Sequence, residues 1–109
     1  MRRIVRLVLL AFPLIVLGAD PAPAADLIGV VLLHGKEGGP SAPVLRSLVR
    51  SLEDAGFLLS VPAMPWSRNR IYDATYDGAL DEIGREVAAL RAKGAVKVVV
   101  AGQSLGANA

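Results

Sequence analysis

The sequence of 109 residues lacks cysteine altogether and has only one histidine. The absence of cysteine excludes disulfide bonds, and it also excludes a lipid-attachment cysteine near the amino terminus. Basic residues do not cluster after the first few positions, and the formal net charge is only +2. The composition therefore gives no indication of a nucleic-acid-binding surface.

The first 24 residues have the pattern of a secretory signal peptide. Arg2 and Arg3 precede an apolar segment at residues 7–17, and Ala22 and Ala24 are the small residues that a signal peptidase requires. A membrane anchor is the alternative, but residues 4–17 fall short of the roughly 20 apolar residues that span a bilayer. We therefore predict a periplasmic or secreted protein that consists of residues 25–109, with membrane contact only through an uncleaved signal segment. Without residues 1–24, which hold three arginines and Asp20, nine basic and nine acidic residues remain.

Apolar runs and amphipathic segments alternate through residues 25–109. The runs at 27–33, 57–61 and 95–101 are typical of strands in a parallel sheet. The segments between them carry apolar residues at helical spacing, with Ser41 as the expected N-cap of the first helix and Gly56 and Gly94 ending the two helices. The helical positions are Leu45, Leu48, Val49 and Leu52, then Tyr76, Leu80, Ile83, Val87 and Leu90. The pattern predicts an incomplete α/β fold of three parallel strands joined by crossover helices. Three strands alone would leave both edges of the sheet bare, so neighbouring strands from outside this sequence are expected to cover them.

The third apolar run leads directly into Gly102-Gln103-Ser104-Leu105-Gly106, a G-x-S-x-G sequence. In a nucleophile elbow, this sequence forms a tight turn between a strand and a helix that holds the serine in the open. Side chains at positions 102 and 106 would crowd such a turn, which explains glycine at both. We therefore predict that Ser104 is a nucleophile and that the Leu105 N–H binds an oxyanion. The alternative is an ordinary glycine–serine turn after a buried strand.

A second candidate element is the glycine-rich loop that begins with His34-Gly35 at the end of the first apolar run. Because the carboxyl ends of parallel strands meet at one edge of a sheet, this loop is expected to face Ser104. A backbone N–H in it, from Lys36 or a neighbour, is the expected second oxyanion donor. His34 is expected to fix the turn by hydrogen bonding, and the alternatives are a catalytic base and a purely structural histidine.

Other features of the sequence are interpreted as structural. The acidic residues of the second helical segment are expected to form a solvated helix face; they are Asp73, Asp77, Asp81, Glu82 and Glu86. Their spacing does not match a metal site, and the loop after His34 lacks the P-loop and dinucleotide-binding spacings. Trp66, Arg68 and Arg70 fall in a segment that we interpret as an exposed loop, with a role in lining the substrate side as the alternative.

The segment from Leu32 to Gly35, the strand–helix alternation and the G-x-S-L-G-A-N-A elbow together resemble the amino-terminal part of the α/β-hydrolase superfamily, most closely its exported bacterial members. The resemblance implies a serine hydrolase that acts on acyl or ester substrates without a cofactor or metal, with Ser104 as nucleophile, Leu105 and Lys36 as oxyanion donors, and His34, Gly35, Gly102 and Gly106 shaping the loops. Gln103 stands where many members have histidine. In that family the acid and base follow the serine, so we expect an inactive amino-terminal fragment of such an enzyme. The alternative function is a noncatalytic exported binding module, and a further alternative is an unstable truncated product.

Overall fold

A three-stranded parallel sheet forms the centre of the protein. The computed structural model describes residue 18 and residues 25–109, so the expected signal peptide lies, apart from residue 18, outside the described residues. Strand β1 (Ile28–Leu33) lies between β2 (Leu58–Ser60) and β3 (Lys97–Gly102). Val30 is in register with Leu59 on one side and with Val99 on the other. The predicted three parallel strands are confirmed.

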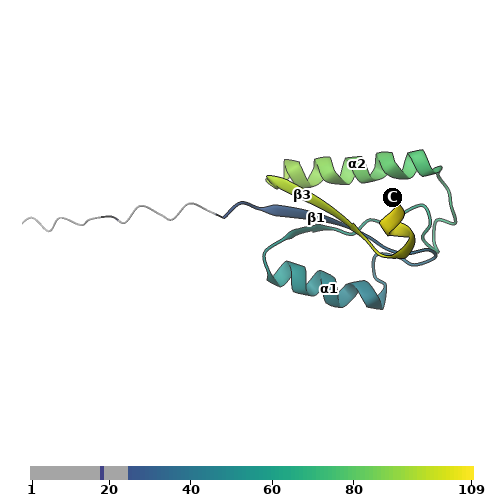
Figure 1. Ribbon diagram of the computed structural model, residues 1–109, viewed down its shortest axis with the longest axis horizontal. Coiled ribbons are helices and arrows are strands. Elements are labelled where there is room, and N and C mark those ends of the chain that lie inside the picture. The colour runs from purple at the N-terminus through teal and green to yellow at the C-terminus, as the bar shows by residue number, and fades with distance from the viewer. Residues whose placement is uncertain (1–17, 19–24) are drawn as a thin grey trace, which may run out of the picture.

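Two helices cover opposite faces of this sheet (Figure 1). Helix α1 (Pro43–Asp54) connects β1 to β2, and helix α2 (Tyr76–Ala92) connects β2 to β3. Both helices end as predicted at a glycine in the left-handed conformation, Gly56 with φ 90° and Gly94 with φ 104°. The structure thus confirms the α/β arrangement with crossover helices.

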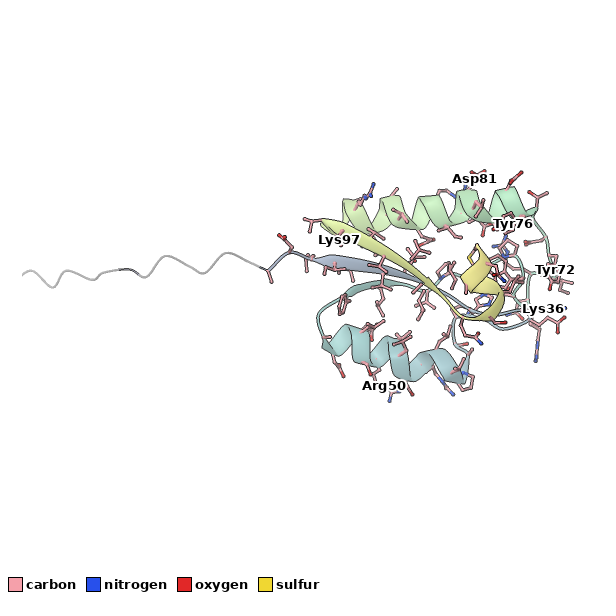
Figure 2. All side chains as sticks on the ribbon, in the orientation of Figure 1. Lys36, Arg50, Tyr72, Tyr76, Asp81 and Lys97 are labelled. Carbon is pink, nitrogen blue, oxygen red and sulfur yellow. The ribbon has the colours of Figure 1, made fainter. Side chains whose placement is uncertain are left out.

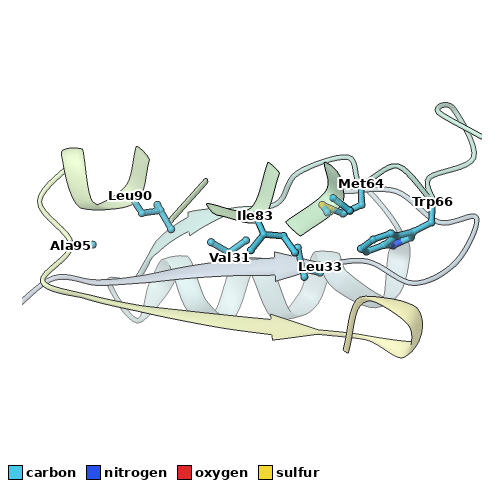
Figure 3. Packing of buried hydrophobic residues seen from close by; sticks show 8 residues of the cluster. Val31, Leu33, Met64, Trp66, Ile83, Leu90 and Ala95 are labelled. Carbon is cyan, nitrogen blue, oxygen red and sulfur yellow. The ribbon is translucent and has the colours of Figure 1, made fainter. Parts of the chain in front are cut away.

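The main core lies between the sheet and α2 (Figure 3). Alternate residues of β1 point to this face, where Val31 and Leu33 pack with Ile83 and Leu90 of α2. The intervening residues Val30 and Leu32 point to the opposite face, and they are buried as well. Burial on both faces explains why this segment of the sequence is almost continuously apolar.

Some local expectations were wrong. Ala42, not Ser41, is the N-cap of α1, and no side chain caps it. Pro43 explains why the helix begins one residue later. Proline restricts the preceding residue to an extended conformation, and at the first helical position the N–H group that proline lacks would have no acceptor anyway. Leu48, expected in the apolar stripe of α1, is 45% exposed.

Both edges of the sheet are bare, as expected for three strands by themselves. In the part of the chain that the structure describes, β2 and β3 have no outer neighbour, and Val99 and Val100 of β3 are nearly half exposed. Residues 25–109 thus supply none of the covering strands, which were expected from outside this sequence. None of the helices formed by those residues has the length and apolarity needed to cross a membrane.

Candidate functional site

Ser104 lies at a sharp turn between β3 and a five-residue 3-10 helix, η1 (Ser104–Asn108). Its side chain is exposed, and its φ of 55° is in the left-handed region, which non-glycine residues rarely adopt and which is concentrated at functional sites. A helix was expected after the serine, and the described residues form this short 3-10 helix. The turn therefore presents the hydroxyl of Ser104 at the surface.

The two glycines of the G-x-S-x-G sequence are required by close backbone contacts. A Cβ atom at Gly102 would lie 2.2 Å from the carbonyl oxygen of Gly106. A Cβ atom at Gly106 would lie 2.8 Å from the carbonyl oxygens of both Leu33 and His34. The first glycine allows the turn to close on itself, and the second allows it to pack against the end of β1.

The turn at Ser104 and the β1 loop, which we define as residues 34–40, are in direct contact. The N–H of Gln103 donates to the carbonyl of Leu33 at 3.0 Å. A Cβ atom at Gly35 would lie 2.6 Å from Oε1 of Gln103 and 3.2 Å from Cβ of Ser104. The structure thus brings together the two segments that the sequence analysis singled out, 70 positions apart, at the carboxyl edge of the sheet.

The ring of His34 is fully buried, and it connects the β1 loop to the loop that follows β2. Its Nδ1 lies 2.8 Å from the carbonyl oxygen of Gly35, and its Nε2 lies 3.0 Å from the backbone N of Met64. These partners assign the tautomer, because Nε2 must accept from the Met64 N–H and Nδ1 must then donate its proton to Gly35. Both ring nitrogens are engaged, so neither is free to take a proton from Ser104.

Trp66 also connects the loop that follows β2 to the β1 loop. Its indole N–H donates to the carbonyl of His34 at 2.7 Å, and its own carbonyl accepts from the N–H of Glu37 at 2.8 Å. The side chain is only 5% exposed, so the interpretation of residues 66–70 as an ordinary exposed loop was wrong for Trp66. The lone tryptophan, which is large and apolar and follows a proline, was the signal that could have indicated burial.

Several backbone amides close to Ser104 have no recorded acceptor within the part of the chain that the structure describes. In the β1 loop, Glu37 donates to Trp66, and Gly38 donates to Gly35 at 3.1 Å. Among the residues described, no protein acceptor is recorded for the N–H groups of Gly35, Lys36, Ser104 and Leu105. Lys36 and Leu105, whose amides the sequence analysis assigned to oxyanion binding, are among these residues, one in each of the two segments that meet beside Ser104.

Arg70 anchors the loop between β2 and α2. Its guanidinium contacts both carboxylate oxygens of Glu82, at 2.6 and 2.7 Å, and also those of Asp73, at 2.9 and 3.0 Å. The hydrogen bond from Arg70 lowers the pKa of Glu82, and the hydrogen bonds from Glu82 and Asp73 raise the pKa of Arg70. Arg68, by contrast, is exposed as expected.

Two of the acidic residues of α2 are thus not part of a solvated face. Glu82 is paired with Arg70 and is 21% exposed, and the carboxylate of Glu86 accepts a hydrogen bond from the hydroxyl of Ser60. Asp77 and Asp81 are exposed, as expected. Among residues 25–109, no group of three or more potential ligands is arranged to hold a metal ion.

Comparisons with protein-family models, with curated proteins and with solved structures found no match to this chain.

Proposed function

We propose that this chain is the nucleophile-bearing part of an exported serine hydrolase with an α/β-hydrolase fold. One observation carries the proposal. Ser104 is exposed in a strained backbone conformation, between two glycines that tolerate no side chain, and in contact with a loop that has an unpaired amide. This combination is what the chemistry of an activated serine requires of the backbone.

The topology of the sheet supports a site at this position. The strand order β2-β1-β3 means that the chain leaves β1 toward one edge and then crosses back to the other. In open α/β sheets, ligands bind outside the carboxyl ends of the strands where the direction of the connections reverses. Here that point lies between β1 and β3, where the β1 loop and Ser104 meet.

In the proposed reaction, Oγ of Ser104 attacks the acyl carbon of an ester, and the leaving alcohol departs. The amides of Lys36 and Leu105 stabilise the negative charge that develops on the carbonyl oxygen. A donor of this kind contributes about 3 kcal/mol to transition-state stabilisation. Water then releases the acyl group from Ser104.

A base must take the proton of Ser104, and His34 does not fit this role because its ring is buried and both nitrogens are bonded. The proposal therefore assigns the base and its acidic partner to a part of the protein outside residues 1–109. Loss of the serine or histidine of a comparable triad costs on the order of 10⁶ in turnover. Residues 25–109 alone are accordingly expected to have no useful esterase activity, which a spectrophotometric assay with an activated ester measures.

The decisive experiment is labelling of the complete protein with a serine-reactive fluorophosphonate. We expect labelling of the wild type, loss of labelling in Ser104→Ala, and retention in the matched control Ser51→Ala, which removes an exposed hydroxyl from α1. Labelling that survives Ser104→Ala would remove Ser104 from the mechanism. An unlabelled wild type would favour a noncatalytic binding module.

Export is the second part of the proposal. It follows from the basic start, the short apolar segment and the small residues near Ala24. Intact-mass analysis of the protein recovered from the periplasm or medium is expected to show an amino terminus at Ala25 or Asp26. A product that retains residues 1–24 would contradict cleavage.

A further inference from the structure

A cavity of about 170 Å³ opens beside the residue that follows Ser104. It lies between η1, the start of α2 and the preceding loop, and Leu105 forms one wall. The other walls are mainly aromatic and small apolar side chains, among them Trp66, Tyr72, Ala74 and Tyr76. The cavity therefore offers an apolar surface next to the proposed point of attack.

Exposed aromatic side chains surround this cavity. Tyr72 is 51% exposed and Tyr76 is 54% exposed, and both lie at the same end of the molecule as η1 and Lys36 (Figure 2). The hydroxyl of Tyr76 donates to the carbonyl of Asn108 at 2.6 Å, which ties α2 to η1 at the rim. Exposed apolar and aromatic groups gathered at a hollow are typical of binding sites.

The backbone at the rim provides an independent observation. Ile71 and Tyr72 both have a positive φ, of 51° and 56°, which is a true outlier for a β-branched residue. Hydrogen bonds hold this bend, from the Ile71 N–H to the Ser67 carbonyl at 3.0 Å and from the Tyr72 N–H to the Pro65 carbonyl at 2.7 Å. Strain of this kind persists only where the surroundings enforce it, and it is concentrated at ligand sites. Here the strained backbone places Tyr72 in the wall of the cavity.

We infer that this cavity binds the acyl group of the substrate, and that the enzyme prefers esters with a compact apolar acyl group of about the size of a benzene ring. The inference rests on the proposed function. An apolar cavity of about 150 Å³ accommodates benzene, so a volume of about 170 Å³ suits a benzoyl group or a short branched chain. A long fatty acyl chain exceeds it.

The kinetic test compares p-nitrophenyl benzoate, acetate and laurate as substrates of the complete protein. We expect kcat/KM for benzoate to exceed that for laurate at least tenfold. Ala74→Phe fills the cavity from its loop side, and it should lower the ratio of kcat/KM for benzoate over acetate at least tenfold. The matched control Ala89→Phe adds the same ring at an exposed position of α2 and should leave this ratio unchanged.

A binding test separates this inference from the proposed function. Trp66 is the only tryptophan in the sequence, and it lines the cavity, so its fluorescence reports occupancy. The Ser104→Ala protein titrated with methyl benzoate should show saturable binding that Ala74→Phe weakens at least tenfold and Ala89→Phe does not. Labelled Ser104 with no such binding and no acyl-size preference would overturn the inference alone. Binding without labelling of Ser104 would overturn the proposed function and, with it, the acyl assignment.

Discussion

Trp66→Phe is the substitution that most directly tests how the β1 loop is held. Phenylalanine keeps an aromatic ring in the buried position but removes the N–H that donates to the His34 carbonyl at 2.7 Å. That carbonyl stays buried, because the residue is 0% exposed. The substitution therefore removes one hydrogen bond and leaves its acceptor without a partner.

The expected loss of stability has two parts. An unpaired buried acceptor costs about 2 kcal/mol. The smaller ring leaves roughly 40 Å³ unfilled, which at about 24 cal/mol per Å³ adds about 1 kcal/mol. We therefore expect the free energy of unfolding of the complete protein to fall by about 3 kcal/mol.

Urea denaturation followed by far-ultraviolet circular dichroism measures this loss, and hydrogen exchange locates it. The Glu37 N–H, bonded to the Trp66 carbonyl at 2.8 Å, should exchange about 100-fold faster, because each 1.4 kcal/mol corresponds to about a factor of ten. Tyr72→Phe is the control, because the residue is half exposed and no hydrogen bond of its hydroxyl is recorded in the part of the chain that the structure describes. Its effect should stay within about 0.5 kcal/mol. If Trp66→Phe matched this control in both measurements, the indole would not hold the β1 loop.

Three further substitutions test the turn at Ser104, the ion pair between Arg70 and Glu82, and the N-cap of α2. All three are measured by urea denaturation of the complete protein. Gly102→Ala should cost about 3 kcal/mol, because its Cβ would lie 2.2 Å from the Gly106 carbonyl oxygen; a loss below about 1 kcal/mol would contradict the tight turn. Glu82→Gln should cost about 1 kcal/mol at pH 7, since its side chain is 21% exposed and paired with Arg70. Arg70 lowers the pKa of Glu82 in the folded state, so this stabilisation is complete above the unfolded value of about 4.3 and is lost as the pH falls through the lower folded value. A difference from wild type that persisted below that range would refute the charge pairing. Thr75→Ala should cost about 1 kcal/mol, because the threonine hydroxyl caps α2 by accepting from the Gly78 N–H at 3.0 Å; Thr75→Ser should retain most of the stability.

The sequence allowed prediction of those parts of the fold that depend on local periodicity. The almost continuous apolar run of β1 and the helical spacing from Tyr76 to Leu90 each depend on residues close in the chain. The glycines that end the helices, Gly56 and Gly94, have the left-handed φ values that their position required. Such features follow from backbone sterics and the burial of one face, and both can be read from a single sequence.

Features that depend on distant partners were not predictable in the same way. The hydrogen bond of Trp66 spans 32 positions, and the pairing of Arg70 with Glu82 spans 12. The acidic residues of α2 had the spacing of a solvated face, yet Glu82 and Glu86 found partners on the neighbouring loop and strand. A helix pattern shows which residues share a face, but it does not show which loop will lie across that face.

The contact between the β1 loop and Ser104 was predictable only in part. Neither the G-x-S-x-G sequence nor His34-Gly35 contains information about the other, but the β/α alternation places the ends of parallel strands at one edge. The sequence did not show how closely the β1 loop and the turn at Ser104 approach each other. The structure shows this at two glycines. A Cβ atom at Gly106 is excluded, because it would lie 2.8 Å from the backbone oxygens of Leu33 and His34. One at Gly35 would lie 3.2 Å from Cβ of Ser104, a close contact that a small shift could relieve. The glycine at position 106 is therefore explained by the end of β1, and a side chain introduced there would push apart the two segments whose amides are proposed to bind the oxyanion.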